Sequence, residues 1–232
     1  MIYVRRTGER RHIKSATQDT FLTFDPENKA DHFHRGFRGL EALNEEVPLP
    51  TMSFQPNKGE PVEVLTYVRD GAVLSWDSAG KQEQVRAGEF HRTSPRSKIR
   101  RHFINESLIG RSQAFQIWFR PEGGESRSRP EQAQFTNAER RGVLRPVASS
   151  DGKSGSLRIH QDMQVYSSIL LTGQHVVHEI GRGRGAWLHV VEGRVALRDL
   201  VLDTGDGAGL EDEVAVSITA QAPSEVLLIN LA

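Results

Sequence analysis

The sequence predicts an all-β protein that consists of two stacked jelly-roll β-barrels in one chain, with few short helices. Three observations predict this class: strand-like segments recur along the chain, glycine-containing turns separate them, and no segment shows a long, clean helical period. The length of 232 residues suffices for one large domain or two small ones.

The clearest strand signals lie in the first half of the chain. Residues 62–68 are rich in the β-branched and aromatic side chains that strands favour. The pair Asp70-Gly71 then predicts a tight turn, and residues 72–77 are interpreted as the returning strand of a hairpin. Residues 113–119 alternate in polarity, which predicts a further strand.

A polar segment and a faint internal repeat divide the chain into two similar halves. Residues 120–142 are mostly polar and contain Pro and Gly, so they are interpreted as a crossover between domains. The segment 68–73 (VRDGAV) resembles 190–195 (VVEGRV), and each copy is followed by a second turn of glycine and an acidic residue. We therefore predict an N-terminal barrel over 1–130 and a C-terminal barrel over 131–232.

The composition limits the partners of the protein. Lys and Arg number 30 and Asp and Glu number 30, so no net field attracts the chain to nucleic acid or to a membrane surface. The absence of cysteine excludes disulfides and thiolate metal sites. No segment has the pattern of a signal peptide or the ~20 apolar residues of a membrane span. The expected location is the cytoplasm.

Several segments resemble a known family. They include 54–60 (FQPNKGE), the block 65–90, 160–163 (HQDM), 187–193 (WLHVVEG) and the terminal run 224–231. On these segments the chain resembles the bacterial pirin-like proteins, which are two-domain members of the cupin superfamily, and the resemblance covers nearly the whole chain. It implies a bicupin fold and a single metal, usually iron, in the N-terminal barrel only. Some members are similar to quercetin dioxygenases, and others act as regulators through protein contacts.

The family's metal ligands are a His-x-His pair and a His-x-Glu pair, and the matching positions here are Asn57, Gly59, Arg101 and Phe103. A mononuclear oxygenase needs about three protein ligands with lone pairs. An amide oxygen is a weak ligand, glycine and phenylalanine offer none, and arginine is always protonated. We therefore expect a degenerate metal site and no metal cofactor.

Neighbouring residues suggest what occupies the N-terminal barrel instead. His102 lies one position from the expected histidine, and such a shift turns a strand residue to the other face. His91 follows the Gly88-Glu89 turn and either borders the pocket or is a structural or solvent-facing residue. We expect Arg101 to point into the former metal cavity, where Glu60 or Glu63 neutralises it, because an unpaired buried guanidinium is costly. In a variant of this hypothesis Arg101 binds a small anionic ligand.

Three functions follow from these expectations. The first is a metal-free pirin-like protein that binds a partner protein or a small organic molecule, in regulation or stress. The second is an enzyme similar to quercetin 2,3-dioxygenase that holds its metal with atypical ligands. The third is a cofactor-free enzyme that uses His91 or His102 as an acid or base. The loss of metal ligands favours the first, a protein that is not an enzyme.

Overall fold

The computed structural model describes residues 1–54, 62–77, 80–94, 101–107, 109–120 and 129–232, and for residues 53, 54, 77, 101 and 102 it describes the backbone alone. Most of these residues form β-strands, which confirms the predicted all-β class. Helical structure in the described part is limited to short turns at η1 (Thr7–Glu9), α1 (Asn137–Arg140) and η2 (Lys153–Gly155). Within the same residues, no helix is long and apolar enough to cross a membrane.

The chain forms two compact units. The N-terminal unit contains Arg11–Gly36 and Leu40–Gln134, and the C-terminal unit contains Met1–Arg10, Phe37–Gly39 and Phe135–Ala232. These ranges differ from the predicted 1–130 and 131–232 mainly in the first ten residues. They join the C-terminal unit because β1 (Ile2–Arg5) pairs antiparallel with β20 (Gly207–Leu210) and covers its edge.

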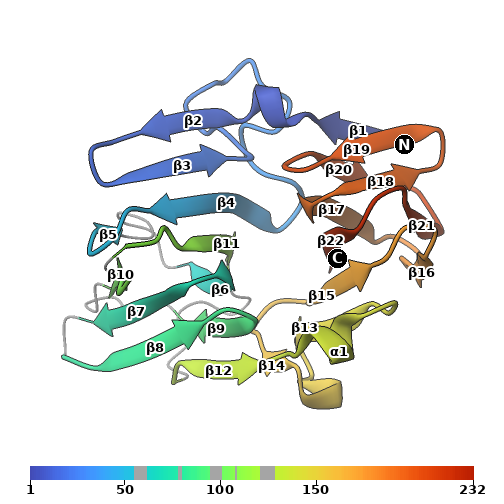
Figure 1. Cartoon of the computed structure of the whole chain (residues 1–232). Helices are drawn as coiled ribbons and strands as arrows, with labels where there is room; N and C mark the ends of the chain where they lie inside the picture. The colour runs from blue at the N-terminus through green and yellow to red at the C-terminus, as the bar shows by residue number, and fades with distance from the viewer. Residues whose placement is uncertain (55–61, 78–79, 95–100, 108, 121–128) are drawn as a thin grey trace. The chain divides into compact units, whose positions relative to one another are not determined.

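The N-terminal unit consists of two antiparallel sheets (Figure 1). The larger sheet has the order β12-β9-β6-β11-β4-β3-β2, and the smaller has the order β5-β10-β7-β8. The strands of the larger sheet are β2 (Arg11–Lys14), β3 (Gln18–Leu22), β4 (Leu40–Pro48), β6 (Glu63–Asp70), β9 (Glu89–Thr93), β11 (Gln113–Phe119) and β12 (Glu131–Gln134). Those of the smaller sheet are β5 (Ser53–Phe54), β7 (Ala72–Asp77), β8 (Gln82–Arg86) and β10 (Arg101–Asn105).

One face of the larger sheet packs against the smaller sheet and forms the interior of this unit. Val68 on β6 and Ala114 on β11 form one buried cluster with residues of the smaller sheet, namely Val73, Val85 and Phe103. Because side chains alternate along a strand, every second residue from Val68 or Ala114 also faces this interior.

The predicted strands over 62–68, 72–77 and 113–119 correspond to β6, β7 and β11. The predicted hairpin across Asp70-Gly71 is wrong, since β6 and β7 belong to different sheets. Gly71 has a φ of +73°, and a Cβ there would lie 2.5 Å from the Ser112 hydroxyl. The local turn signal is therefore real, but the chain uses the turn to pass from one sheet to the other.

The C-terminal unit repeats this arrangement. Its larger sheet has the order β1-β20-β17-β22-β15-β13-β14, and its smaller sheet has the order β16-β21-β18-β19. Its other strands are β13 (Arg145–Ser149), β14 (Leu157–Arg158), β15 (Met163–Leu170), β16 (His175–Glu179), β17 (Gly185–Glu192), β18 (Arg194–Leu197), β19 (Leu200–Asp203), β21 (Ala215–Ala220) and β22 (Ser224–Leu231). The interior between these sheets is a continuous aliphatic cluster that includes Leu188, Ala208 and Leu228.

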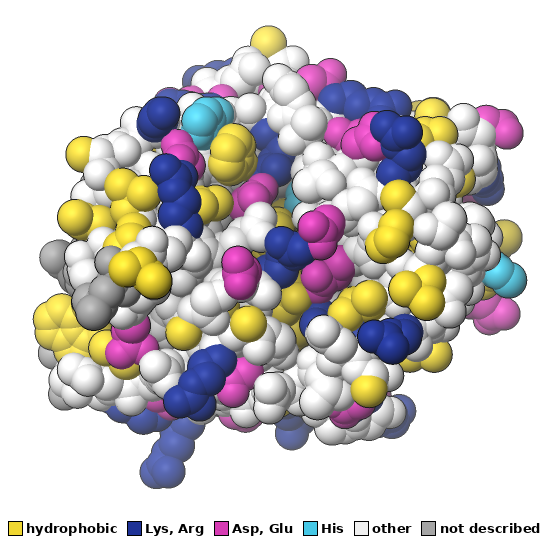
Figure 2. Space-filling view, viewed as in Figure 1, with side chains coloured by type: hydrophobic (Ala, Val, Ile, Leu, Met, Phe, Trp, Pro, Cys, Tyr) yellow, Lys and Arg dark blue, Asp and Glu magenta, His cyan; other side chains and the backbone are white. Residues whose placement is uncertain are grey.

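The surface mixes charges of both signs. On the face drawn in Figure 2, Lys and Arg side chains lie next to Asp and Glu side chains. This distribution agrees with the balanced composition of 30 basic and 30 acidic residues.

Candidate functional site in the N-terminal unit

Phe103 is the one family metal position whose side chain the structure describes. It lies on β10, is fully buried and packs in the apolar cluster with Val68 and Ala114. A phenyl ring has no lone pair, so it does not fit a metal centre at this position. Asn57 and Gly59 lie outside the described residues, as does the side chain of Arg101. The degenerate character of these three positions stays a prediction.

His91 lies inside the N-terminal unit, beside Phe103. It is fully buried on β9, and its ring centroid is 6.4 Å from that of Phe103, in an edge-to-face arrangement. Its Nε2 lies 3.2 Å from Glu83 Oε2 on β8. This hydrogen bond is the largest of the effects that lower the pKa of Glu83 to about 2. The prediction that His91 borders the family's metal region is thus consistent with its contacts, although its role stays untested.

Glu63 forms a fully buried ion pair. Arg92 Nη1 lies 3.0 Å from Glu63 Oε1, and the Ser94 hydroxyl donates to the same oxygen at 2.8 Å. Arg92 is adjacent to His91 on β9, so its side chain lies on the opposite face of the larger sheet. The pairing of Arg101 with Glu60 or Glu63 stays a prediction, since the Arg101 side chain and Glu60 lie outside the described residues.

His102 lies on β10, where its backbone is paired with Trp76 on β7. Its side chain lies outside the described residues, and its proposed acid–base role is therefore untested.

A row of polar side chains crosses the interior face of the larger sheet. Asn44 on β4 is opposite Gln116 on β11, Gln116 is opposite Thr66 on β6, and Thr66 is opposite His91 on β9. We call these four residues the polar row. Asn44 is 5% exposed, and the other three are fully buried. The row faces the smaller sheet, because Thr66 alternates with Val68, and His91 contacts β8 and β10.

Asn44, Thr66 and Gln116 of the polar row each have one buried atom without a hydrogen-bond partner in the described structure, namely Asn44 Oδ1, Thr66 Oγ1 and Gln116 Nε2. The other amide atom of Gln116, Oε1, accepts from Trp118 Nε1 at 3.2 Å. Buried polar groups in native proteins are nearly always paired with protein or with bound molecules. These three atoms therefore mark a place where the protein offers hydrogen bonds that its own chain does not use.

Sequence reasoning missed this row, although the sequence contains a signal for it. Thr66 and Gln116 stand at inward positions of the strands predicted over 62–68 and 113–119. A polar residue at an inward position needs a partner. Which residues share the row could not be deduced, because strand pairing brings together residues that are far apart in sequence.

Glu46 adds a titratable group to the same face. It follows Asn44 on β4 with one residue between them, and it is 5% exposed. Burial raises the pKa of Glu46 to about 7, while the hydrogen bond from the Thr20 hydroxyl, 2.6 Å long, acts in the opposite direction. Gln18 Nε2 also donates to Glu46, at 3.3 Å. The interior thus includes a carboxyl group that changes its charge near neutral pH.

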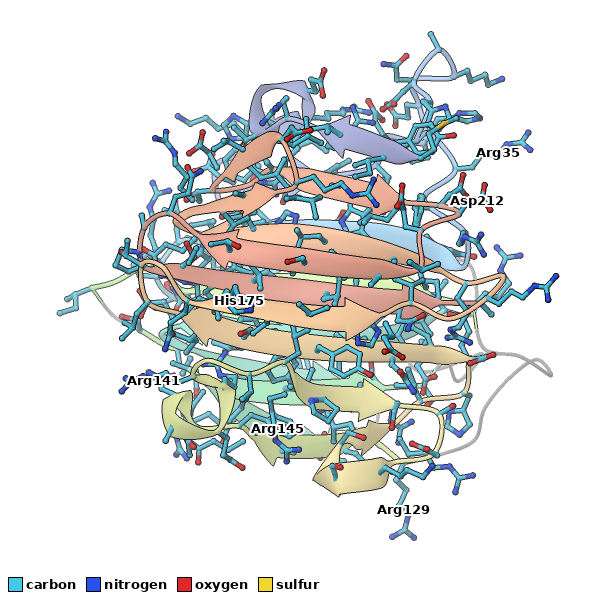
Figure 3. All side chains as sticks on the ribbon, turned by 90° about the vertical axis from the view of Figure 1, so that its right-hand side faces the viewer. Arg35, Arg129, Arg141, Arg145, His175 and Asp212 are labelled. Carbon is cyan, nitrogen blue, oxygen red and sulfur yellow. The ribbon has the colours of Figure 1, made fainter. Side chains whose placement is uncertain are left out.

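The described residues hold no cluster of three or more His, Asp or Glu side chains suited to a metal ion. The histidines of the C-terminal unit do not take part in such a cluster among the described residues. His175, labelled in Figure 3, is exposed on β16, whereas His178 Nε2 lies 2.8 Å from Asn230 Nδ2. His189 is fully buried, and burial, with a smaller effect of Arg10, holds its pKa well below 6.5.

Two units of paired, mainly antiparallel sheets, with equivalent turns after β6 and β17, define a two-domain protein of the cupin type. A family model described as "Pirin" matches residues 3–119, and a model described as "Quercetinase C-terminal cupin domain" matches residues 146–231. The chain belongs to the pirin family.

Similar proteins span its whole length. A protein of Escherichia coli (strain K12) named quercetin 2,3-dioxygenase is 38% identical over 231 residues, which is 100% of this chain and 99% of that protein. A pirin-like protein of Caulobacter vibrioides is 28% identical over 210 residues, which is 90% of this chain and 88% of that one.

The solved structures agree with this kinship. YhhW from Escherichia coli superposes with a TM-score of 0.92 at 38% identity, covering 100% of this chain and 98% of that one. A structure of the bacterial pirin YhhW in complex with nickel(II) has a TM-score of 0.87 at 36% identity, covering 100% and 99%. The expected family and the two-barrel cupin fold are confirmed.

Proposed function

We propose that this protein has a flavonol of the quercetin class as its ligand and binds it in the N-terminal unit. The observation that carries the proposal is the similarity to the Escherichia coli protein of that name, 38% identical over 100% of this chain. Of the functions expected from the sequence, the comparisons favour the dioxygenase over a metal-free regulatory protein.

The dioxygenase form of this function requires a metal. Phe103, the family position whose side chain the structure describes, is not a metal ligand. Phe103 is buried in an apolar cluster. The other three positions carry Asn57, Gly59 and Arg101, none of which is a strong ligand for a transition metal. We therefore derive no catalytic step through a metal, and a metal retained by this chain needs ligands elsewhere.

Phe103 supports a second candidate, a protein that binds the flavonol, or a protein partner, without metal. An apolar ring in place of a ligand closes one coordination position and adds contact area for an aromatic molecule. His91 and Phe103, with ring centroids 6.4 Å apart, offer aromatic surfaces of this kind. In this form the scaffold of the family is kept for recognition.

One experiment separates the two candidates and tests the shared proposal. The protein is purified from cells supplied with nickel, iron or manganese, and its metal content is measured together with quercetin binding and oxygen uptake. The Escherichia coli relative serves as the positive control. About one metal per chain with oxygen uptake on quercetin supports the dioxygenase, and quercetin binding without either supports the metal-free form. Failure to bind quercetin under all these conditions overturns the proposal.

A further inference from the structure

The polar row is assembled by the backbone register of four neighbouring strands. In the sheet order, β4, β11, β6 and β9 follow one another, as Figure 1 shows. Neighbouring strands lie about 4.8 Å apart, so the side chains of Asn44, Gln116 and Thr66 are spaced over roughly 10 Å. The row therefore places its hydrogen-bonding side chains along a line across the sheet rather than around a single point.

The fold itself does not require polar residues at these positions. Gly71 and Gly193 occupy equivalent turns, and counting back the same number of residues from each leads to Thr66 and Leu188. The cross-strand partners then define the remaining equivalences. Asn44, Gln116, Thr66 and His91 correspond to Tyr166, Leu228, Leu188 and Ala208.

The C-terminal unit fills these equivalent positions mainly with aliphatic side chains. Leu188, Leu228 and Ala208 are buried in its hydrophobic cluster, and Tyr166 packs against that cluster. Burying a polar atom without a partner destabilises the folded state. The N-terminal unit has three such atoms at positions where the C-terminal unit has mainly aliphatic side chains. This difference indicates that the three atoms bind a partner outside the chain.

The chemistry of the row defines that partner. Asn44 Oδ1 can accept a hydrogen bond and Gln116 Nε2 can donate one. The Thr66 hydroxyl can do either. These three side chains carry no charge, so they suit a neutral ligand better than an anion. A molecule with both hydroxyl donors and carbonyl or ring-oxygen acceptors, spaced along a rigid frame, satisfies all three.

We infer that Asn44, Gln116 and Thr66 form a hydrogen-bonding subsite for a neutral polyhydroxylated aromatic ligand inside the N-terminal unit. The choice of a flavonol as its natural occupant rests on the proposed function. The subsite itself rests on the strand register, the burial and the unused hydrogen-bonding atoms. In this inference the three side chains recognise the ligand's hydroxyl and carbonyl groups. This role does not depend on whether the protein then oxidises the ligand.

The subsite is tested with Thr66→Val, which removes one hydroxyl and keeps the shape of the side chain. The matched control is Thr23→Val, since the Thr23 hydroxyl is also buried and without a partner but lies outside the row. Quercetin binding is measured by calorimetry for the wild type and both variants. We expect the Kd to rise about tenfold in Thr66→Val, which corresponds to about 1.4 kcal/mol, and to stay unchanged in Thr23→Val.

A second comparison uses the ligand instead of the protein. Unsubstituted flavone lacks the hydroxyl groups of quercetin, so wild-type protein should bind it more weakly, and Gln116→Leu should reduce that preference. Equal quercetin affinity in the wild type, Thr66→Val and Gln116→Leu overturns the inference. Such a result, together with higher thermal stability of the variants, identifies the row as a site for water alone.

The inference stays testable if the wild type does not bind quercetin, an outcome that rejects the proposed function. The same variants are then titrated with catechol, a small ligand with two adjacent hydroxyl groups. Catechol binding that Thr66→Val weakens and Thr23→Val preserves supports the subsite. Absence of catechol binding in the wild type overturns it.

Discussion

Arg92 and Glu63 form a fully buried ion pair in the larger sheet of the N-terminal unit, with 3.0 Å between Nη1 and Oε1. The Ser94 hydroxyl and the Arg129 carbonyl oxygen provide further hydrogen bonds to the pair. Two buried charges are tolerated when each has such partners. The pair lies on the face of the larger sheet opposite to His91 and the polar row. It therefore stabilises the sheet from the face that the polar row does not occupy.

Removal of one partner of this pair should destabilise the protein strongly. We expect Glu63→Gln to lower the free energy of unfolding by about 3 kcal/mol, because the buried Arg92 loses its buried counter-charge and keeps only that of the half-exposed Glu131, 2.9 Å away. Urea denaturation measures the change. Arg194→Met is the control, since the Arg194–Asp203 pair is exposed and its loss should destabilise the protein far less. Equal effects of both variants would contradict the structural role of the buried pair.

Glu46 should make stability depend on pH near neutrality. Its pKa is raised to about 7 in the folded protein, from 4.5 in the unfolded chain, so the folded state binds the extra proton between these values. Stability therefore falls as the pH rises through this interval. Glu46→Gln should remove that fall. The free energy of unfolding of the variant, relative to that of the wild type, should therefore increase by on the order of 3 kcal/mol from pH 5 to pH 8.

Denaturation of both proteins at several pH values tests this expectation. Thr20→Val provides a second check, because the Thr20 hydroxyl lowers the pKa of Glu46 and its removal should move the transition to higher pH. A difference between the wild type and Glu46→Gln that does not vary with pH would show that the carboxyl group is not buried as described.

The Glu83–His91 hydrogen bond should give an acid-sensitive contribution of the opposite sign. The pKa of Glu83 is lowered to about 2, mainly by His91, so its contribution to stability is present above pH 4.5 and is lost as the pH falls toward 2. Glu83→Gln should be less stable than the wild type at pH 7, and the gap should narrow by pH 3. A gap of constant size from pH 7 to pH 3 argues against this pairing.

Restoring the family's ligands should restore metal binding. The combined substitution Asn57→His, Gly59→His, Arg101→His and Phe103→Glu supplies the His-x-His and His-x-Glu pairs that the resemblance implies. We expect the nickel content to exceed that of the wild type by about one per chain, measured by elemental analysis. The matched control keeps Phe103 and carries only the first three changes, and it should hold nickel more weakly. A nickel content equal to that of the wild type contradicts the expectation.

Much of the fold was predictable because its signals are local. The β-branched segment at 62–68 and the alternating segment at 113–119 correspond to β6 and β11. The change of sheet after Asp70-Gly71 was not predictable in the same way, because a turn signal does not determine the sheet in which the next strand finds its partner. The same limit explains why the sequence did not indicate that β1 pairs with β20 of the C-terminal unit.

The sequence by itself determined the strands, the two-part organisation, the family and the side-chain chemistry available at Asn57, Gly59, Arg101 and Phe103, because each depends on which residues stand in a short stretch of chain. Only the tertiary structure decided that Arg92 is the partner of Glu63, and that Asn44, Gln116, Thr66 and His91 share one buried face. Such groupings arise from pairing register between distant strands, and a shift of one residue would turn each side chain to the opposite face.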